Sequence, residues 1–416
     1  MMQRRRALQI LTRVGLVVSV FSPQSQAKEQ ERSLGAVATN REIQDDVRGG
    51  KSAFPRWASA PKPLGKLPPG ADGLRVLGEP LFRGMTIGPI ESDLQPGRGY
   101  GSDDFGQTLD VLAESGANWV SLTVFGRAWD LRSPGISSRF ERAPALVRQS
   151  VARSVEMAHA RGLRVMLVPH LWVESGGWRA EIDPQTDEGW RERAIAYESF
   201  VLPWAKVAEE SGVDLFALGV EMRSWVTTQR APSLYPVIQK IRRAYSGLLT
   251  YAANWDDAAD TVIWGALDLI AINAFYPLHW EDDASKEELL AGGQRIAQQV
   301  TELAELWERP VIFSEFGYTA RTITAIRPWL WPEQLGTVQV DPEAQAQAYQ
   351  SFLAAMPEAK GFGGFFVWRM YADLDDLSQE AAWGFSPWQR PAYGVLEEAW
   401  KERYWGDPLL IQSAIQ

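Results

Sequence analysis

Short apolar runs alternate with longer segments of helical period from about residue 80 onward. The apolar runs, which are typical of buried strands, occupy residues 81–87, 119–124, 164–169, 215–220, 249–254, 267–273, 311–314 and 362–368. The segments between and after them predict helices at residues 104–115, 145–162, 191–212, 233–246, 286–308, 342–356 and 393–404, with a short helix at 256–263. This regular alternation constrains the fold more than any other feature of the chain.

Eight strands with intervening helices match the count of a (β/α)8 TIM barrel. Glycines follow several predicted helices, in ESGAN, ARGLR and ESGVD, where glycine can take the left-handed conformation that ends a helix. An open, doubly wound sheet is the alternative, but it usually has a glycine-rich phosphate loop after an early strand. The one glycine-rich stretch, GFGG at 361–364, precedes its strand. We therefore predict an α/β fold with a single (β/α)8 domain at residues 79–408.

The first 78 residues differ in composition from this domain. Residues 1–27 predict a signal peptide, with a basic start at Arg4, Arg5 and Arg6, the apolar run VGLVVSVF and the small-residue site SQA. Residues 28–78 are polar and then rich in proline and glycine, which indicates a linker or a strap. We therefore expect a periplasmic or secreted protein; an uncleaved amphipathic N-terminus is the alternative.

Composition narrows the chemistry and the partners. The 416 residues include no cysteine, which excludes disulfides, thiol catalysis and cysteine-bound metal. The net charge of −10 disfavours nucleic acids and anionic membrane surfaces as partners, and a neutral substrate fits better. No apolar run is long enough to predict a membrane span. We expect a monomer that needs no cofactor.

Catalytic side chains of a barrel lie at the carboxyl ends of its strands. In this sequence those ends carry mostly aromatic residues, carboxylates and amides, namely His170, Trp172, Glu221, Asn254, Trp255, Asp256, Asn273, Tyr276, His279, Glu315, Tyr318, Trp368 and Asp373. None offers the lysine of a Schiff-base enzyme, and no serine lies in a nucleophile elbow. The chain has three histidines in all and no zinc-binding motif, so we expect no metal site.

Two glutamates at strand ends, with aromatic neighbours, suit the hydrolysis of glycosidic bonds. One carboxylic acid protonates the leaving oxygen, and the other carboxylate attacks the sugar carbon or activates water. Aromatic faces supply platforms for the C–H faces of sugar rings, which favours Trp172, Trp255 and Trp368 as substrate contacts. A strand-end carboxylate can equally be structural, but two of them, Glu221 and Glu315, form a more specific pattern.

The sequence resembles glycoside hydrolase family 113 of clan A, best known for endo-β-mannanases, from about residue 82 to residue 400. The resemblance rests on RGMTIG, VMLVPHLWV, GW at 177–178, LGVEM, AANWD, INAFYPL, PVIFSEFGY and GGFFVWRM. It implies that Glu221 is the acid/base, that Glu315 is the nucleophile and that anomeric configuration is retained. It also implies that further residues face the substrate, namely His170, Trp172, Asn254, Tyr276 and Trp368.

One position departs from the clan pattern. Most clan A members place asparagine directly before the acid/base, where it binds the sugar 2-hydroxyl, and this chain has Val220 there. The resemblance therefore predicts the mechanism more firmly than it predicts which sugar is bound. Mannose remains compatible with Val220.

The mechanism sets requirements on protons and distances. Glu315 must be ionised to attack, with Tyr276 as a candidate hydrogen-bond donor, and its charge should keep the proton on Glu221. Carboxyl groups about 5–5.5 Å apart predict retention, and groups about 6.5–9.5 Å apart predict inversion.

Other functions fit the same residues. Another clan A activity, such as that of a cellulase or β-glucosidase, would use the same glutamate pair, and a non-catalytic glycan-binding envelope protein could share the barrel. The loops after the second and seventh strands are long and should wall the cleft. Whether cleavage is internal or terminal is not set by the sequence.

Overall fold

The computed structural model describes residues 82–88, 98–138, 143–281, 284–330, 338–376 and 379–401. The predicted signal peptide at 1–27 and the predicted linker or strap at 28–78 lie outside these residues, as do both ends of the predicted catalytic domain.

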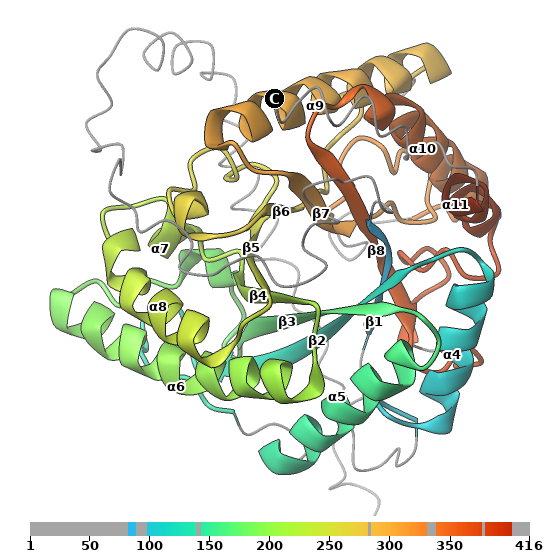
Figure 1. Ribbon diagram of the computed structural model, residues 1–416. Coiled ribbons are helices and arrows are strands. Elements are labelled where there is room, and N and C mark those ends of the chain that lie inside the picture. The colour runs from blue at the N-terminus through green and yellow to red at the C-terminus, as the bar shows by residue number, and fades with distance from the viewer. Residues whose placement is uncertain are drawn as a thin grey trace, which may run out of the picture.

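Eight parallel strands close into one barrel in chain order, as predicted (Figure 1). The strands are β1 Phe82–Gly88, β2 Trp119–Ala128, β3 Arg164–Val173, β4 Leu215–Val220, β5 Leu248–Asn254, β6 Ile270–Asn273, β7 Val311–Phe316 and β8 Phe362–Tyr371. The pairing of β1 with β8 closes the ring and places Phe82 opposite Gly364. This is the (β/α)8 architecture.

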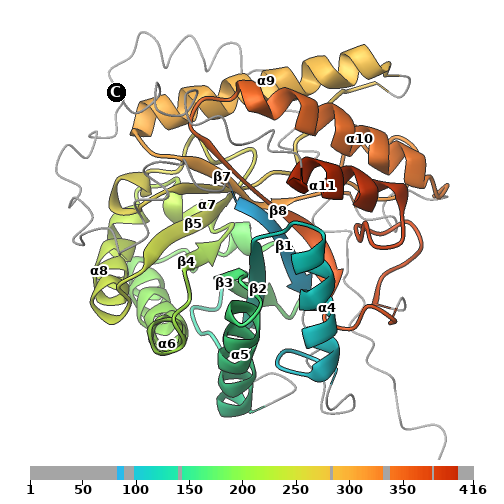
Figure 2. The same ribbon diagram turned by 45° about the vertical axis from the view of Figure 1, so that its right-hand side comes forward.

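Helices surround the barrel (Figure 2). They are α4 Asp103–Glu114, α5 Pro144–His159, α6 Asp187–Ser211, α7 Arg223–Val226, α8 Tyr235–Ala244, α9 Lys286–Trp307, α10 Pro342–Ala355 and α11 Pro391–Lys401. Short 3-10 helices occur at η1 Arg179–Glu181, η2 Ala231–Leu234, η3 Trp264–Ala266 and η5 Met356–Glu358. Within the described ranges, no helix is long and apolar enough to cross a membrane.

Local sequence signals set several helix ends. Ser285 and Glu288 form a reciprocal capping box that begins α9. Gly212 ends α6 with φ at 73°, a left-handed conformation that glycine adopts without steric cost. Because β4 starts three residues later, this glycine turns the chain directly back into the barrel.

Apolar side chains fill two spaces. One cluster lies between the strands and the outer helices, and a second, smaller cluster includes Phe82, Trp119, Met166, Leu215 and Phe366. The Phe82 and Trp119 rings, from the first residues of β1 and β2, lie 4.5 Å apart. Because the amino ends of the strands are packed in this way, the carboxyl ends are left to form the site.

The segment between β5 and β6 differs from the prediction. Residues 255–260 form turns rather than the predicted short helix at 256–263, and only η3 follows them. Asp257 is buried there and accepts a hydrogen bond from Arg223 at 3.0 Å, while Trp264 Nε1 donates to the Ala258 carbonyl at 2.9 Å. These side-chain interactions stabilise the turns, and helical periodicity does not report them.

Candidate active site

Glu221 directly follows β4 in a strained backbone conformation. Its φ is +47°, which side chains other than glycine rarely adopt. Its N–H donates to the Ala252 carbonyl at 2.8 Å, and the next N–H, of Met222, donates to the Tyr251 hydroxyl at 2.5 Å. Two bonds to β5 therefore fix the strand end at which the Glu221 side chain leaves the barrel wall.

Asn273 and Glu315 are register partners on β6 and β7. The Ser314 hydroxyl donates to Asn273 Oδ1 at 3.0 Å, so the amide of Asn273 presents its NH2 group on its other side. That group donates to Glu221 Oε1 at 2.9 Å. Asn273 thereby links the strand of one glutamate to the carboxylate of the other.

The second oxygen of Glu221 has two further donors. Trp178 Nε1 and Arg179 Nη2 each lie 2.9 Å from Glu221 Oε2. Both residues come from the loop after β3, in which Arg179 opens η1. With Asn273, two segments hold the Glu221 carboxylate in one position through two hydrogen bonds and one ion pair.

Glu315 lies in a different environment. The pKa of Glu315 is raised to about 8, mainly by burial and then by the charge of Glu221, while the charges of Arg179 and Arg369 oppose the rise. Within the described residues, Glu315 Oε1 has no hydrogen-bond partner; His170 Nε2 lies 3.6 Å away. Burial, with the charges of Arg179 and Arg369, holds the pKa of His170 well below its usual range, so this pair is not an ion pair at neutral pH.

Both glutamates line one cavity with mostly aromatic walls. Its lining residues are Phe125, His170, Trp172, Trp178, Arg179, Glu221, Asn254, Phe275, Glu315, Trp329, Trp368, Arg369 and Phe385. Six of the eight site residues expected from the sequence are among them. The His170 ring stacks on that of Trp368, with centroids 6.3 Å apart.

The other two expected residues, Trp255 and Tyr276, are not among the lining residues. Trp255 stacks on the cavity residue Trp329 at 5.2 Å, and Tyr276 packs against Trp255 and Phe313. Among the contacts of the described residues, the Tyr276 hydroxyl has no hydrogen bond to Glu315. The pKa of Tyr276 is raised mainly by burial, and the charges of Asp256 and Asp257 raise it as well. Both side chains support the wall from behind.

Several cavity residues were not expected from the sequence. Phe125 lies on β2 just beyond its expected end at residue 124, and Arg369 lies on β8 just beyond its expected end at residue 368. Arg369 lies over the Trp368 ring, 4.9 Å from its centroid, and the peptide bond between the two is cis. Longer strands would have pointed to both residues. Arg179 directly follows the GW motif, but nothing in the sequence ties it to Glu221.

Three other strand-end residues lie apart from the glutamates. Asp256 pairs with Arg223, His279 bonds with Glu281, and Asp373 pairs with Arg98. Among the described residues, no three His, Asp or Glu side chains are placed to hold one metal ion.

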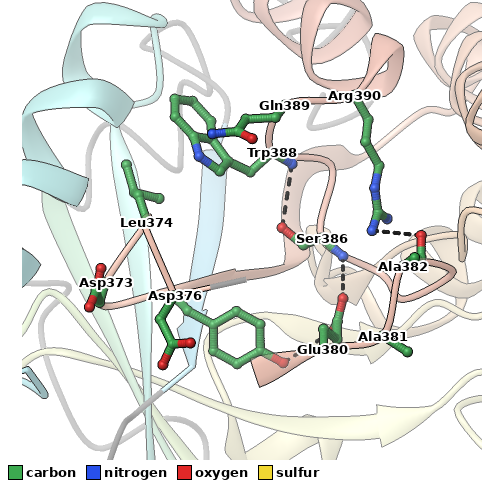
Figure 3. A pocket seen from close by; sticks show the side chains of 11 residues that line it. Asp373, Leu374, Asp376, Glu380, Ala381, Ala382, Ser386, Trp388, Gln389 and Arg390 are labelled. Carbon is green, nitrogen blue, oxygen red and sulfur yellow. Dashed lines mark hydrogen bonds between the residues drawn. The ribbon is translucent and has the colours of Figure 1, made fainter. Parts of the chain in front are cut away.

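A larger cavity of about 350 Å³ lies in the loop after β8 (Figure 3). Glu380 accepts from the Ser386 N–H at 2.7 Å and from the Tyr371 hydroxyl at 3.2 Å, and Arg390 donates to the Ala382 carbonyl. Tyr371 also accepts from Arg369 Nε at 2.9 Å. These bonds hold Arg369 near the end of β8 and hold the following loop, which brings Phe385 to the glutamate cavity.

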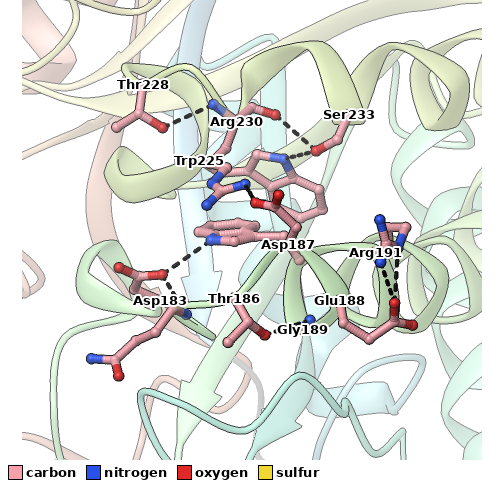
Figure 4. A network of polar contacts seen from close by, with 12 residues as sticks. Asp183, Thr186, Asp187, Glu188, Gly189, Arg191, Trp225, Thr228, Arg230 and Ser233 are labelled. Atoms are coloured by element: carbon pink, nitrogen blue, oxygen red, sulfur yellow. Dashed lines mark hydrogen bonds and ion pairs between the residues drawn. The ribbon is translucent and has the colours of Figure 1, made fainter.

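The loop that carries Trp178 and Arg179 is anchored by a polar network (Figure 4). Trp190 Nε1 donates to Asp183 Oδ1 at 3.0 Å, and Arg230 pairs with Asp187 at 2.5 Å. The network ties the start of α6 to the segment after α7. The donors to Glu221 therefore sit on a braced loop.

A closed (β/α)8 barrel with two buried carboxylates in an aromatic cavity has the parts of a barrel glycosidase. Comparison with known proteins agrees, because the profile of Glycoside Hydrolase Family 113 matches residues 95–384. The chain belongs to glycoside hydrolase family 113 and is a glycoside hydrolase of the mannanase-like kind.

Solved structures show the same relationship. The family 113 β-mannanase AaManA from Alicyclobacillus acidocaldarius, in complex with ManMIm, is 27% identical with a TM-score of 0.67, over 78% of this chain and 98% of that one. A family 113 β-1,4-mannanase is 20% identical with a TM-score of 0.67, over 78% and 100%. A family 5 mannosidase from Rhizomucor miehei shares the fold at 12% identity and a TM-score of 0.54, over 81% and 95%. No curated protein matches the chain.

Proposed function

We propose that the protein is a retaining β-mannanase that cleaves β-1,4-mannan or manno-oligosaccharides with Glu221 and Glu315. The observation that carries the proposal is that both glutamates, from β4 and β7, line one aromatic cavity in a family 113 chain. The likeness to AaManA, described as a β-mannanase, supports the choice of substrate.

Two displacements at the sugar carbon make up the reaction. First, a carboxylate oxygen of Glu315 bonds to C1 while the C1–O bond breaks, and Glu221 gives its proton to the leaving oxygen. Then Glu221 takes a proton from water, whose oxygen bonds to C1 and releases Glu315. No net proton is gained or lost over the cycle.

The glutamate pair has to hold one proton before the first step. Burial, followed by the charge of Glu221, raises the pKa of Glu315 to about 8, so the pair keeps a proton at neutral pH. Glycosylation needs that proton on Glu221 and the negative charge on Glu315.

Amides near the glutamates bear on sugar recognition. Val220 offers no amide before the acid/base, but Asn254 lines the cavity and is the register partner of Asn273. The Asn254 NH2 group donates to Asp256 at 2.6 Å, so its oxygen remains to accept from a sugar hydroxyl. We assign Asn254 to that contact.

Hydrolysis of a defined glycan ladder tests the function. The wild type should cleave β-1,4-manno-oligosaccharides faster than the matching cello-oligosaccharides, and NMR should show the β-anomer formed first. Glu315→Ala should abolish hydrolysis of both oligosaccharide series. Glu221→Ala should retain hydrolysis of aryl glycosides with activated leaving groups, because these need no acid. Glu188→Ala, at an exposed position, is the matched control.

A first product with α configuration would contradict retention. Faster cleavage of the cello-oligosaccharides would contradict mannan as the substrate. Glycan binding without turnover by the wild type would leave the non-catalytic alternative.

We also propose that the protein is exported to the periplasm or medium and acts as a monomer. The support is the basic and apolar pattern of residues 1–27. N-terminal sequencing of the extracellular or periplasmic protein should begin near residue 28, and light scattering should give the mass of one chain. A mature protein that keeps residue 1 would contradict export by cleavage.

A further inference from the structure

Two tryptophans stand exposed at the mouth of the barrel. In the described part of the chain, Trp129 and Trp280 are the two tryptophans among the exposed large apolar side chains, at 70% and 49% exposure. Trp129 directly follows β2, and Trp280 lies in the loop after β6. Both therefore lie beyond carboxyl ends of strands, on the face of the barrel that carries the glutamates.

The strand order places the two strands that precede these tryptophans on opposite sides of the barrel. The eight strands form a closed ring in chain order, and β2 and β6 are four strands apart in both directions. The cavity with Glu221 and Glu315 lies between these strands, and its lining includes Phe125 of β2 and Phe275 just after β6. An extended glycan that crosses the cavity between these walls would emerge toward Trp129 and Trp280.

The end of β2 leads from the cavity wall to Trp129. Phe125 lines the cavity, and Arg127, two residues on, lies over the Trp172 ring at 5.6 Å from its centroid. Alternate residues of a strand share a face, so Phe125 and Arg127 form one row, and Trp129 follows directly after the end of the strand. The Ser175 N–H donates to the Trp129 carbonyl at 2.9 Å, which extends the pairing of β2 with β3 by one more bond.

The turn that carries Trp129 is fixed in place. Asp130 Oδ1 accepts from the N–H groups of Arg132 and Ser133 at 2.8 and 2.6 Å. The Asp183 N–H donates to the Leu131 carbonyl at 2.7 Å, which ties this turn to the loop of Trp178 and Arg179. A rigid backbone that presents an exposed indole loses little entropy when a ligand stacks on it.

The opposite loop is held before it reaches Trp280. The Leu278 N–H donates to the Ala325 carbonyl at 2.8 Å, and Arg295 of α9 donates to the Pro277 carbonyl at 3.1 Å. Gly292 lets α9 approach this loop, since a Cβ there would lie 1.9 Å from the Leu278 carbonyl oxygen. The Glu281 N–H donates to the His279 ring at 3.0 Å, which closes the turn around Trp280.

We propose that Trp129 and Trp280 are outer sugar-binding platforms at opposite ends of the cleft. Each stacks on one unit of a β-linked glycan, beyond the units held next to the glutamates. The inference rests on the proposed function and deepens it, because it assigns two ends to the bound chain. A protein partner is disfavoured, since two single side chains on opposite sides of the glutamate cavity form no continuous apolar patch.

A cleavage-frame experiment tests the platforms. Trp129→Ala and Trp280→Ala are compared with wild type on manno-oligosaccharides of two to six units labelled at the reducing end. Each variant should lose about three- to tenfold in kcat/KM on the longest substrates and little on the shortest, as expected for one lost stacking contact. Because the platforms lie at opposite ends, the two variants should shift the preferred cleavage site of the hexasaccharide in opposite directions.

Matched controls come from equally exposed apolar residues elsewhere. Ile195 on α6 and Leu306 on α9 are 67% and 63% exposed, and their alanine variants should change neither rate nor frame. Trp129→Phe and Trp280→Phe should keep most of the long-substrate rate. The proposal would be overturned if the loss in kcat/KM did not depend on substrate length. It would also be overturned if both variants shifted the preferred cleavage site in the same direction.

Failure of the proposed function gives a different result. If the wild type cleaves cello- but not manno-oligosaccharides, the proposed substrate is wrong. The cleavage sites of the variants on cello-oligosaccharides then test whether Trp129 and Trp280 bind sugar units. If the wild type binds the oligosaccharides without cleaving them, the platforms are tested by binding instead. Both variants should then lose affinity for the long oligosaccharides. A wild type that neither binds nor cleaves either ladder overturns both proposals.

Discussion

Arg223 lies over the Trp178 ring, with its guanidinium carbon 4.7 Å from the ring centroid, while Trp178 Nε1 donates to Glu221. Arg223 is itself held by two carboxylates after β5, Asp256 and Asp257. A charged side chain two residues after Glu221 therefore positions the glutamate through an indole from a different loop. Arg223 is a positioning residue in this arrangement and lies outside the lining of the glutamate cavity.

Replacing Arg223 should lower turnover more than substrate binding. In Arg223→Lys the planar group that stacks on Trp178 is lost, so Glu221 loses its fixed position, and kcat should fall about tenfold with KM nearly unchanged. Aryl glycosides with activated leaving groups should be less affected, because they need little help from the acid.

Arg164→Lys is the matched control for this prediction. Arg164 lies over the Trp119 ring at 5.8 Å, and both are the first residues of their strands, at the opposite end of the barrel from Glu221. Steady-state kinetics on both substrate types, with melting temperatures for both variants, separate positioning from folding. Equal losses in the two variants would contradict the role of Arg223.

The alkaline limb of the rate profile should report the proton of the glutamate pair. Burial raises the pKa of Glu315 to about 8, and below that pH the free enzyme holds one proton on the pair. Above it the proton is lost and no acid remains, so kcat/KM on natural glycans should fall as pH rises through about 8. An activated aryl glycoside should show a shallower limb. Limbs of equal depth on both substrates would assign the titration to another group.

Glu315→Gln should stabilise the protein at alkaline pH while it abolishes activity. The pKa of Glu315 rises from 4.5 in the unfolded chain to about 8 in the folded protein, so both states are protonated below pH 4.5. Between these values the folded state alone keeps the proton, and stability falls as pH rises. The gain in melting temperature over wild type should therefore be small near pH 4 and largest above pH 8. The exposed Glu188→Gln change should give no such trend, and a gain independent of pH would contradict the prediction.

Gly219, two residues before Glu221, should not tolerate a side chain. A Cβ there would lie 2.2 Å from the Tyr197 hydroxyl oxygen and 2.7 Å from the Met222 methyl carbon. Gly219→Ala should cost about 1–3 kcal/mol of unfolding free energy, as overpacking does. Adding Tyr197→Phe should recover part of that loss.

Gly135→Ala is the control, because a Cβ there meets nothing within 4 Å. Chemical denaturation of the four variants checks the prediction. Strict additivity of Gly219→Ala and Tyr197→Phe would show that the hydroxyl is not what obstructs the methyl group.

The strand ends were predictable from the sequence because they depend on local pattern. Period and turn signals placed all eight strands, and strand ends in a barrel share one face, so Glu221 and Glu315 were expected together. Trp255 and Tyr276, which do not line the cavity, come just after strands as well. Being near a strand end does not say whether a side chain points into the cavity or packs behind Trp329, since loop packing decides that.

By itself, the sequence determined the barrel, the glutamate pair and the family, because hydrophobic period and motif order are properties of the chain. Only the tertiary structure decided how the pair is held. The donors to Glu221 come from residues 178, 179 and 273, and Arg223 reaches it through Trp178. The structure also decided the raised pKa of Glu315, because that pKa depends on burial and on charges from other strands and loops. The position of the Glu221 carboxylate and the pKa of Glu315 both depend on many neighbours that come together only on folding. No local sequence pattern predicts either of them.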